Sequence, residues 1–226
     1  MAVPDGQPVP HAYTNSVTAQ GELVTKTYRG PGAGGRQQRE ELAIRSLADR
    51  LPVATIVDSR PGVLVLAHVP GRHGQDRIDR GEGEAVMFRL GRLLREVQAV
   101  RPCFFDEFHG DGVLVHQDFG ANNVLFAEHD DSIVLLADWE WSTVGSPITD
   151  LAWAELIVRM HHPDHQDCLP ALFDGYGARP PWPERQAAMR QRAAALATWV
   201  CSFRGADAAS TWDHRQRSIE QWREIS

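Results

Sequence analysis

Lysine is almost absent from this chain. Of its 23 basic residues, Lys26 is the only lysine and the others are arginines. A bias toward arginine-rich codons accounts for the arginines, but it does not account for the single lysine that is kept. We therefore treat Lys26 as a candidate functional residue, with a chance lysine as the alternative.

Cysteines are few, and their spacing excludes two kinds of site. Cys103, Cys168 and Cys201 are odd in number, widely spaced and form no C-x-x-C motif. A disulfide framework or a cysteine zinc site is therefore not expected, and a reducing cytoplasm fits. The polar, proline-rich start Met1–Pro10 lacks the apolar stretch of a signal peptide. Apolar runs such as Val63–Ala67 are far too short to span a membrane, so we expect a cytoplasmic protein without a membrane partner.

Excess negative charge argues against a nucleic-acid partner. The formal net charge is −7 over 226 residues, whereas nucleic-acid-binding proteins carry a basic patch. A negative surface would suit a cationic substrate, although mild acidity is also common among soluble proteins. A chain of this length fits one domain or two small lobes, and it leaves open whether the protein is a monomer or a homodimer.

Hydrophobic periodicity divides the chain into a β-rich first third and an α-rich remainder. The expected strands are Val17–Ala19, Leu23–Tyr28, Ala54–Asp58, Val63–His68, Val113–His116, Asn123–Phe126 and Ile133–Ala137. The expected helices are Arg36–Arg50, Glu84–Val100, Asp150–Met160, Gln186–Phe203 and Ala208–Arg223. The polar stretch Arg72–Arg80 is the expected linker. This order suggests two lobes with a cleft between them, an N-terminal lobe of residues 1–70 and a C-terminal lobe of residues 71–226.

Two short motifs combine carboxylate and amide side chains at a spacing that suits phosphoryl transfer. Asp118 is followed by Asn123 five residues later, and Asp138 comes fifteen residues after that. A carboxylate can orient a hydroxyl and accept its proton, and carboxylate and amide oxygens are hard ligands for Mg²⁺. Phosphoryl transfer needs this set, because the protein's task is mostly to position the reactants and neutralise charge.

These motifs resemble those of a known family. The H-x-D-x-x-x-x-N spacing that begins at His116 and the A-D-W-E segment around Asp138 are similar to those of the aminoglycoside phosphotransferase and choline kinase-like family. The resemblance runs from about Tyr13 to Val158. It implies an α+β, protein-kinase-like fold with a small β-rich N-lobe for the nucleotide and a mainly helical C-lobe for catalysis and acceptor binding. It also implies ATP, with GTP as a possibility, Mg²⁺, and transfer to a hydroxyl of a small molecule.

The resemblance assigns catalytic and metal-binding roles to the motif residues. Asp118 would be the catalytic base. Asn123, with Asn122 as the adjacent alternative, and Asp138 would hold Mg²⁺ between the phosphates. Glu140 would be a further metal contact, a group behind the metal ligands, or a purely structural residue.

The resemblance also predicts a nucleotide site in the first lobe. Lys26 would hold the α- and β-phosphates, and its expected partner is Glu40 on the following helix. Glu41 lies one position away and would point elsewhere. Backbone groups between Ala67 and Val69 would bind the adenine.

Four further residues receive supporting or acceptor-side roles. His116 would support the catalytic loop by hydrogen bonding. Asp150, in a G-x-P-x-x-D-L-A segment, would cap the following helix and brace the loop. Trp153 and Glu155 would approach the acceptor and suit an amine-bearing substrate by cation–π contact and ion pairing, although each could equally be a packing residue.

The chain departs from the family pattern in several places. The segment Tyr13–Ser16, which should cover the phosphates, has no glycine, and the glycine-rich run Gly30–Gly35 follows the Lys26 strand and is expected to be a connector. Gln117 replaces the usual glycine of H-G-D. His161 and His165 have the spacing of zinc ligands, but the proline between them favours a polar loop.

The expected activity is therefore that of a small-molecule kinase acting on an aminoglycoside-like or other antibiotic, with a choline, amino-alcohol or amino-sugar kinase as the runner-up. The rival classes are a catalytically silent kinase-like binding protein and a metal-dependent nuclease or hydrolase.

Overall fold

The structure is a computed structural model that describes residues 7–8, 15–204 and 206–225. Its strands are β1 (Gln7–Pro8), β2 (Ser16–Gln20), β3 (Leu23–Thr27), β4 (Ile56–Arg60), β5 (Val63–Ala67), β6 (Arg72–His73), β7 (Val113–Val115), β8 (Val124–Phe126), β9 (Ile133–Leu136) and β10 (Thr143–Gly145). Its α-helices are α1 (Ala33–Leu47), α2 (Gly74–Arg77), α3 (Gly83–Ala99), α4 (Ile148–His161), α5 (Leu169–Tyr176), α6 (Trp182–Arg204) and α7 (Ala206–Gln221). Shorter helical turns are η1 (Ile78–Glu82), η2 (Ala121–Asn123), η3 (Trp139–Trp141) and η4 (Pro163–Cys168).

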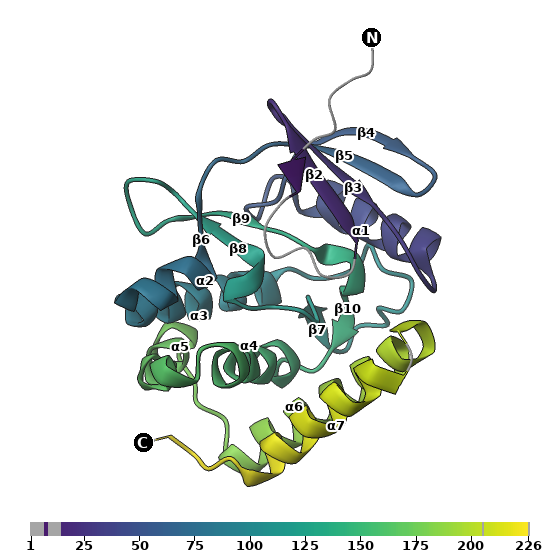
Figure 1. Ribbon diagram of the computed structural model, residues 1–226. Coiled ribbons are helices and arrows are strands. Elements are labelled where there is room, and N and C mark those ends of the chain that lie inside the picture. The colour runs from purple at the N-terminus through teal and green to yellow at the C-terminus, as the bar shows by residue number, and fades with distance from the viewer. Residues whose placement is uncertain (1–6, 9–14, 205, 226) are drawn as a thin grey trace.

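The first part of the chain is an antiparallel sheet in the order β1-β2-β3-β5-β4, with α1 beside it (Figure 1). Lys26 lies opposite Val17 on β2 and Leu64 on β5. Alternation along the strand directs its side chain to one face of the sheet. Lys26 is only 4% exposed. Lysines are rarely buried to this extent unless they are paired.

Two small sheets lie between the five-stranded sheet and the helices (Figure 1). One has the order β6-β8-β9, and the other is the pair β7-β10. The hairpin β8-β9 is decisive for the site, because its two strands begin and end next to the two sequence motifs. The N–H of Ala137 donates to the carbonyl of Asn123 at 2.8 Å. The antiparallel pairing thus brings Asn123 beside Asp138, although fifteen residues separate them.

The main core continues from the sheet into the helical part through α3 and α5. The two helices approach so closely that glycine is required at both contact points. A Cβ on Gly91 would lie 2.1 Å from the carbonyl oxygen of Leu172, and a Cβ on Gly175 would lie 2.0 Å from that of Phe88. Because these obstacles are backbone atoms, a side chain at either glycine would force the helices apart.

A second apolar cluster joins α4 to the antiparallel pair α6 and α7, which lie side by side at the C-terminal end of the fold (Figure 1). Its buried members are Ala152, Trp153, Leu156, Ile157, Met189, Ala193, Trp212 and Ile219. This cluster fixes α6 against α4, which carries Asp150 and Trp153 toward the first motif.

Three local expectations were wrong. Residues 72–80 are not a linker, because they contain β6, α2 and part of the π-helical turn η1. The run Gly30–Gly35 is not only a connector, since α1 begins inside it at Ala33, directly after Gly32 with a φ of 68°. The chain does leave the α-helix at His161, but Pro163 starts the 3₁₀ turn η4 instead of an irregular loop. The short helix α5 was not expected. Tyr13 and Thr14 of the predicted phosphate-covering segment lie outside the described residues.

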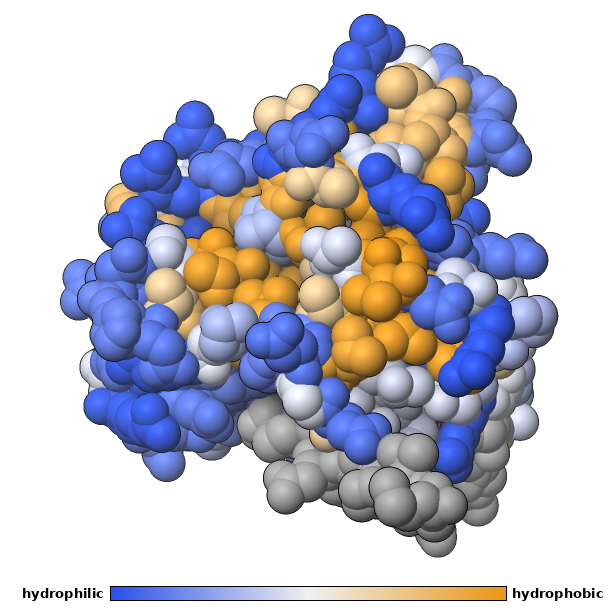
Figure 2. Space-filling view, turned by 90° about the horizontal axis from the view of Figure 1, so that it is seen from above, coloured by the Kyte–Doolittle hydropathy of each residue, from blue (hydrophilic) through white to orange (hydrophobic). Residues whose placement is uncertain are grey.

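Seen from above, apolar groups gather near the middle of the face and hydrophilic groups surround them (Figure 2). Within the described ranges, no helix combines the length and the apolar character needed to cross a membrane.

Candidate active site

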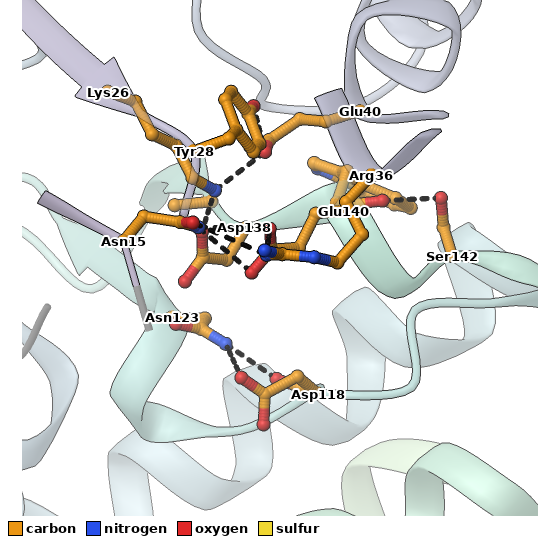
Figure 3. A network of polar contacts seen from close by, with 12 residues as sticks. Asn15, Lys26, Tyr28, Arg36, Glu40, Asp118, Asn123, Asp138, Glu140 and Ser142 are labelled. Carbon is orange, nitrogen blue, oxygen red and sulfur yellow. Dashed lines mark hydrogen bonds and ion pairs between the residues drawn. The ribbon is translucent and has the colours of Figure 1, made fainter. Parts of the chain in front are cut away.

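Asp118 lies in the loop between β7 and η2, where neutral donors hold its carboxylate (Figure 3). The indole N–H of Trp153 donates to Asp118 Oδ1 at 2.8 Å. The amide Nδ2 of Asn123 donates to Asp118 Oδ2 at 2.9 Å and to its carbonyl oxygen at 2.7 Å. Burial, and then the charge of Asp138, raise the pKa of Asp118 to about 6, against the opposing effect of these donors. The two donors hold the carboxylate in one orientation, and a pKa of about 6 leaves most of it ionised at pH 7.

The loop that carries Asp118 is braced from both sides. Asp150 accepts the backbone N–H groups of His116 at 2.6 Å and Gln117 at 2.7 Å. The ring of His116 contacts the carbonyl of Ala137 through Nε2 at 2.8 Å and accepts the N–H of Asp118 through Nδ1 at 3.3 Å. Burial lowers the pKa of His116 to about 4, so the ring is neutral. Asp150 does brace the loop, but it does not cap α4, whose N-cap is Pro147 without a side-chain bond.

Two site residues adopt a left-handed backbone conformation. Gln117 has a φ of 66° and Asp138 a φ of 67°, and no other non-glycine among the described residues has a positive φ. Glycine adopts this region freely, but a residue with a side chain is strained there. Such strain persists only where the surroundings impose it, and it is concentrated at functional sites. The left-handed backbone at position 117 explains why a glycine is usual there, where this chain has Gln117.

Across from this loop, Lys26 lies between two carboxylates (Figure 3). Its Nζ is 2.6 Å from Glu40 Oε2 and also pairs with Asp138 Oδ1. Burial opposes the charge, but Asp138 and Glu40 outweigh it and raise the pKa of Lys26. The hydroxyl of Tyr28 donates to Glu40 Oε2 at 2.5 Å. Glu41 points elsewhere and bonds Arg45 and Ser59.

Glu140 is engaged by the first lobe. Its Oε1 and Oε2 accept the side-chain amide of Asn15 at 3.1 and 2.9 Å, and Oε2 pairs with Arg36 Nη1 at 2.5 Å. Glu140 is 2% exposed. Both oxygens are thus occupied, which favours the structural alternative over a metal contact. Asn15 and Arg36 tie β2 and α1 to the segment that follows Asp138.

A cavity of about 380 Å³ is lined by Lys26, Glu40, Asp138 and Asn123 but not by Asp118. Its volume is within the size range of small-molecule sites. Its apolar walls include Val17, Ala19, Val24, Ile44, Ala54, Leu66, Val69, Val124, Leu125, Leu135 and Leu136. Lys26, Asn123 and Asp138 line its polar end. Ala67 and Val69 line it too. The N–H of Ala67 already donates to the carbonyl of Thr55. A bound base would therefore have to form hydrogen bonds with other backbone groups of this segment.

The polar end of the cavity suits a hard cation. Asn122 Oδ1 is a buried acceptor without a partner, and Asn123 uses only its amide nitrogen to hold Asp118. With the carboxylate of Asp138, these oxygens are the donor type that Mg²⁺ prefers. Within the described ranges, no three His, Cys, Asp or Glu side chains come together in a group that could hold a metal ion. His161 and His165 are therefore not part of such a group.

The two residues predicted on the acceptor side, Trp153 and Glu155, have different surroundings. Trp153 does lie against Asp118, but Glu155 does not face an open site. It is 1% exposed, Oε1 pairs with Arg159 at 2.7 Å, and Oε2 pairs with Arg185 at 2.8 Å. A carboxylate neutralised by two arginines is not available to an amine, so Glu155 stabilises the helical part instead.

Sequence reasoning missed several residues that hold the site. These residues, Tyr28, Arg36 and Arg192, belong to no recognised motif. Their partners, which are Glu40, Glu140 and the carbonyl of Gln117, lie 12, 104 and 75 positions away in the sequence. One signal was present for Asn15, which lies in the segment expected to cover the phosphates.

A family model described as "Phosphotransferase enzyme family" matches residues 105–194. The resemblance stated from the motifs is confirmed. The matched stretch begins shortly before β7, contains both motifs and ends within α6. Among curated proteins, acyl-CoA dehydrogenase family member 11 of Mus musculus is 44% identical over 43 residues. Those residues are 19% of this chain and 6% of that protein, so the chain spans only a small part of its length.

Solved structures cover nearly the whole chain. The GDP and kanamycin complex of APH(2″)-IIia superposes with a TM-score of 0.72 at 10% identity, covering 97% of this chain and 94% of that one. The streptomycin–ATP–APH(2″)-IIa ternary complex gives 0.66 at 12% identity, covering 96% and 89%. A choline/ethanolamine kinase family protein from Mesorhizobium loti gives 0.66 at 15% identity, covering 93% and 86%. At these identities the likeness concerns the fold, and it confirms the α+β, protein-kinase-like fold class.

Proposed function

We propose that this chain moves the γ-phosphate of ATP to a hydroxyl of a small molecule. The observation that carries the proposal is that Lys26, Glu40, Asp138 and Asn123 line one cavity, and that Asn123 also donates to the carboxylate of Asp118, which lies just outside it. That arrangement offers a base on one side and phosphate and cation partners on the other. The nucleotides in the related complexes support the same use of the cavity, with GTP as a second donor.

The proposed reaction follows from what each side chain can do. The oxygen of the acceptor hydroxyl attacks the γ-phosphorus, and Asp118 accepts the proton of that hydroxyl. The bond between the γ-phosphorus and the oxygen that bridges the β- and γ-phosphates breaks, and the nucleoside diphosphate leaves with that oxygen. Trp153 and Asn123 hold the carboxylate of Asp118 in place. Mg²⁺ held by Asp138 and an asparagine oxygen would neutralise charge on the phosphates. Lys26, oriented by Glu40, would bind the α- and β-phosphates in place of its present contact with Asp138.

For the acceptor, we propose an antibiotic of the aminoglycoside type first, because two of the related complexes contain kanamycin or streptomycin. A choline-like amino alcohol or an amino sugar comes second, supported by the choline/ethanolamine kinase relative. Transfer to an antibiotic would give a role in resistance, in a cytoplasmic protein that acts as a monomer or homodimer.

The test is Mg²⁺-dependent consumption of ATP and of GTP against a panel of aminoglycosides, macrolides, cyclic-peptide antibiotics, choline and amino sugars. Asp118→Asn is the blank, because it keeps the shape and removes the base. Turnover with one class that the blank lacks supports the kinase. Nucleotide binding is measured separately by calorimetry, and a chain that binds no nucleotide would instead be a silent binding protein.

A further inference from the structure

One buried arginine differs from all the others that the structure describes. The buried arginines in the described ranges are Arg36, Arg77, Arg159, Arg185 and Arg192. The first four each form an ion pair within 2.8 Å with a glutamate or aspartate. Arg192 forms none, and its Nη2 is buried without any partner. A buried charge without a counter-ion in contact is costly. Burial lowers the pKa of Arg192, and the carboxylates of Asp118 and Asp150, which form no ion pair with it, oppose that effect.

The contacts of Arg192 lead to the loop of the proposed base and to Trp141 of η3. Its Nε donates to the carbonyl of Gln117 at 2.8 Å. Its guanidinium carbon lies 5.6 Å from the centre of the Trp153 ring and 5.8 Å from that of Trp141, which is cation–π range. Trp153 is the residue that donates to Asp118. Arg192 therefore touches the residue before the base and the side chain that orients it.

Gln117 gives this contact a specific purpose. Its left-handed φ of 66° is unfavourable for a residue with a Cβ. Asp150 holds the N–H side of this residue, and Arg192 holds its carbonyl side. With both peptide groups fixed, the strained turn that directs Asp118 toward Asn123 is maintained. A glycine at position 117 would adopt the turn without such help.

We propose that Arg192 is a positioning residue for the transfer reaction, which holds the Gln117 turn and the Trp153 ring so that Asp118 faces the acceptor hydroxyl. The residue lies on α6, far from Asp118 in the sequence, and links the C-terminal helical pair to the chemistry. The proposal rests on the proposed function for its kinetic consequence, but its structural consequence can be measured without any substrate.

The kinetic test replaces the guanidinium with an apolar chain of similar length, Arg192→Met. We expect kcat to fall by about 10- to 100-fold, because a small displacement of a catalytic group has effects of this size, while the KM for nucleotide is unchanged. The melting temperature should shift by no more than about 3 °C, since the lost bond to Gln117 and the lost attraction to Asp118 and Asp150 are offset by removal of a buried charge that has no counter-ion in contact. A purely structural arginine would instead give a large loss of melting temperature.

Two further variants sharpen the kinetic test. Arg190→Met is the matched control, because Arg190 lies on the same helix with a side chain 57% exposed, and its kcat should equal that of the unmodified chain. Arg192→Lys keeps the charge but loses Nε and the planar face, so it should not restore kcat. The proposal is overturned if Arg192→Met and Arg190→Met have the same kcat, or if Arg192→Lys is fully active.

The substrate-free test uses the indole N–H signals of the seven tryptophans in a ¹H–¹⁵N NMR spectrum. Trp153→Phe identifies the Trp153 signal. Arg192→Met should shift this signal and Arg190→Met should not. An unmoved Trp153 signal would overturn the positioning role even if the chain phosphorylates an acceptor. A shifted signal in a chain that shows no turnover with any acceptor would retain the positioning role while the proposed function fails.

Discussion

The two sides of the site are stabilised in different ways. On the Lys26 side, charges pair with each other, with Glu40 and Asp138 sharing one lysine. On the Asp118 side, the carboxylate is held by neutral donors from Trp153 and Asn123. The difference indicates that the Asp118 side is already arranged for its proposed task. Under the proposed function, the Lys26 side would exchange its contact with Asp138 for phosphate and cation when a nucleotide binds.

The largest effect should come from the prearranged side. Asp118→Asn keeps volume and most hydrogen-bonding capacity but removes the proton acceptor, so kcat should fall by about 10²- to 10⁴-fold. Nucleotide affinity should not change, because the side chain does not line the nucleotide cavity. Steady-state kinetics and calorimetry on the same preparation separate the two quantities. Retained turnover would remove Asp118 from the mechanism.

On the paired side, Lys26→Met should weaken nucleotide binding and also destabilise the fold. The variant leaves Glu40, which is 2% exposed, without its cation, and breaking a buried pair costs about 3–5 kcal/mol. Urea unfolding measures the stability and calorimetry the nucleotide affinity. The matched control is the double variant Lys26→Met with Glu40→Gln, which should recover stability but not affinity. Equal affinity in all three chains would make the lone lysine incidental.

The sequence could predict much of the fold, because alternation and helical spacing reflect burial directly. The strands around Lys26 and the hairpin that joins Asn123 to Asp138 follow from such patterns. The helix α5 was missed because an eight-residue helix at the end of another turn offers few periods to recognise. Residues 72–80 were predicted to be a linker because their side chains are polar. The strand β6 in this segment forms by pairing with β8, a tertiary contact that local sequence patterns do not indicate.

The site divides in the same way. Asp118, Asn123 and Asp138 were identifiable because short-range spacing is part of their chemistry. Arg192 was not identifiable, because its bond to Gln117, 75 positions earlier in the sequence, depends on how α6 packs against α4. Glu155 illustrates the opposite error. Its acidic side chain on the expected acceptor side suggested amine binding, but Arg159, four positions later on the same helix, and Arg185 on α6 neutralise it.

A smaller effect concerns pH and the brace behind Asp118. Burial lowers the pKa of His116 from 6.5 to about 4, so the folded state resists protonation that the unfolded chain accepts. Stability from this group is complete above pH 6.5 and declines as pH falls toward 4, by a total of about 3 kcal/mol. Urea unfolding at successive pH values measures the slope.

The control for this slope is His116→Asn, which cannot titrate in that range. The variant should be less stable near neutral pH, because the contact with the Ala137 carbonyl is altered. Its stability should depend less on pH between 6.5 and 4 than that of the unmodified chain. Identical slopes in the two chains would assign the acid sensitivity to other histidines or carboxylates.

The smallest effect should come from the link between the lobes at Glu140. Asn15→Ala removes the donor to both carboxylate oxygens, but Arg36 still pairs with Oε2 at 2.5 Å, so we expect a loss of about 1 kcal/mol. Arg36→Met is the contrasting variant and should cost more, since it leaves a buried carboxylate without a cation. Urea unfolding of both chains tests this order. A greater loss from Asn15→Ala than from Arg36→Met would mean that the amide, and not the ion pair, joins the first lobe to the segment after Asp138.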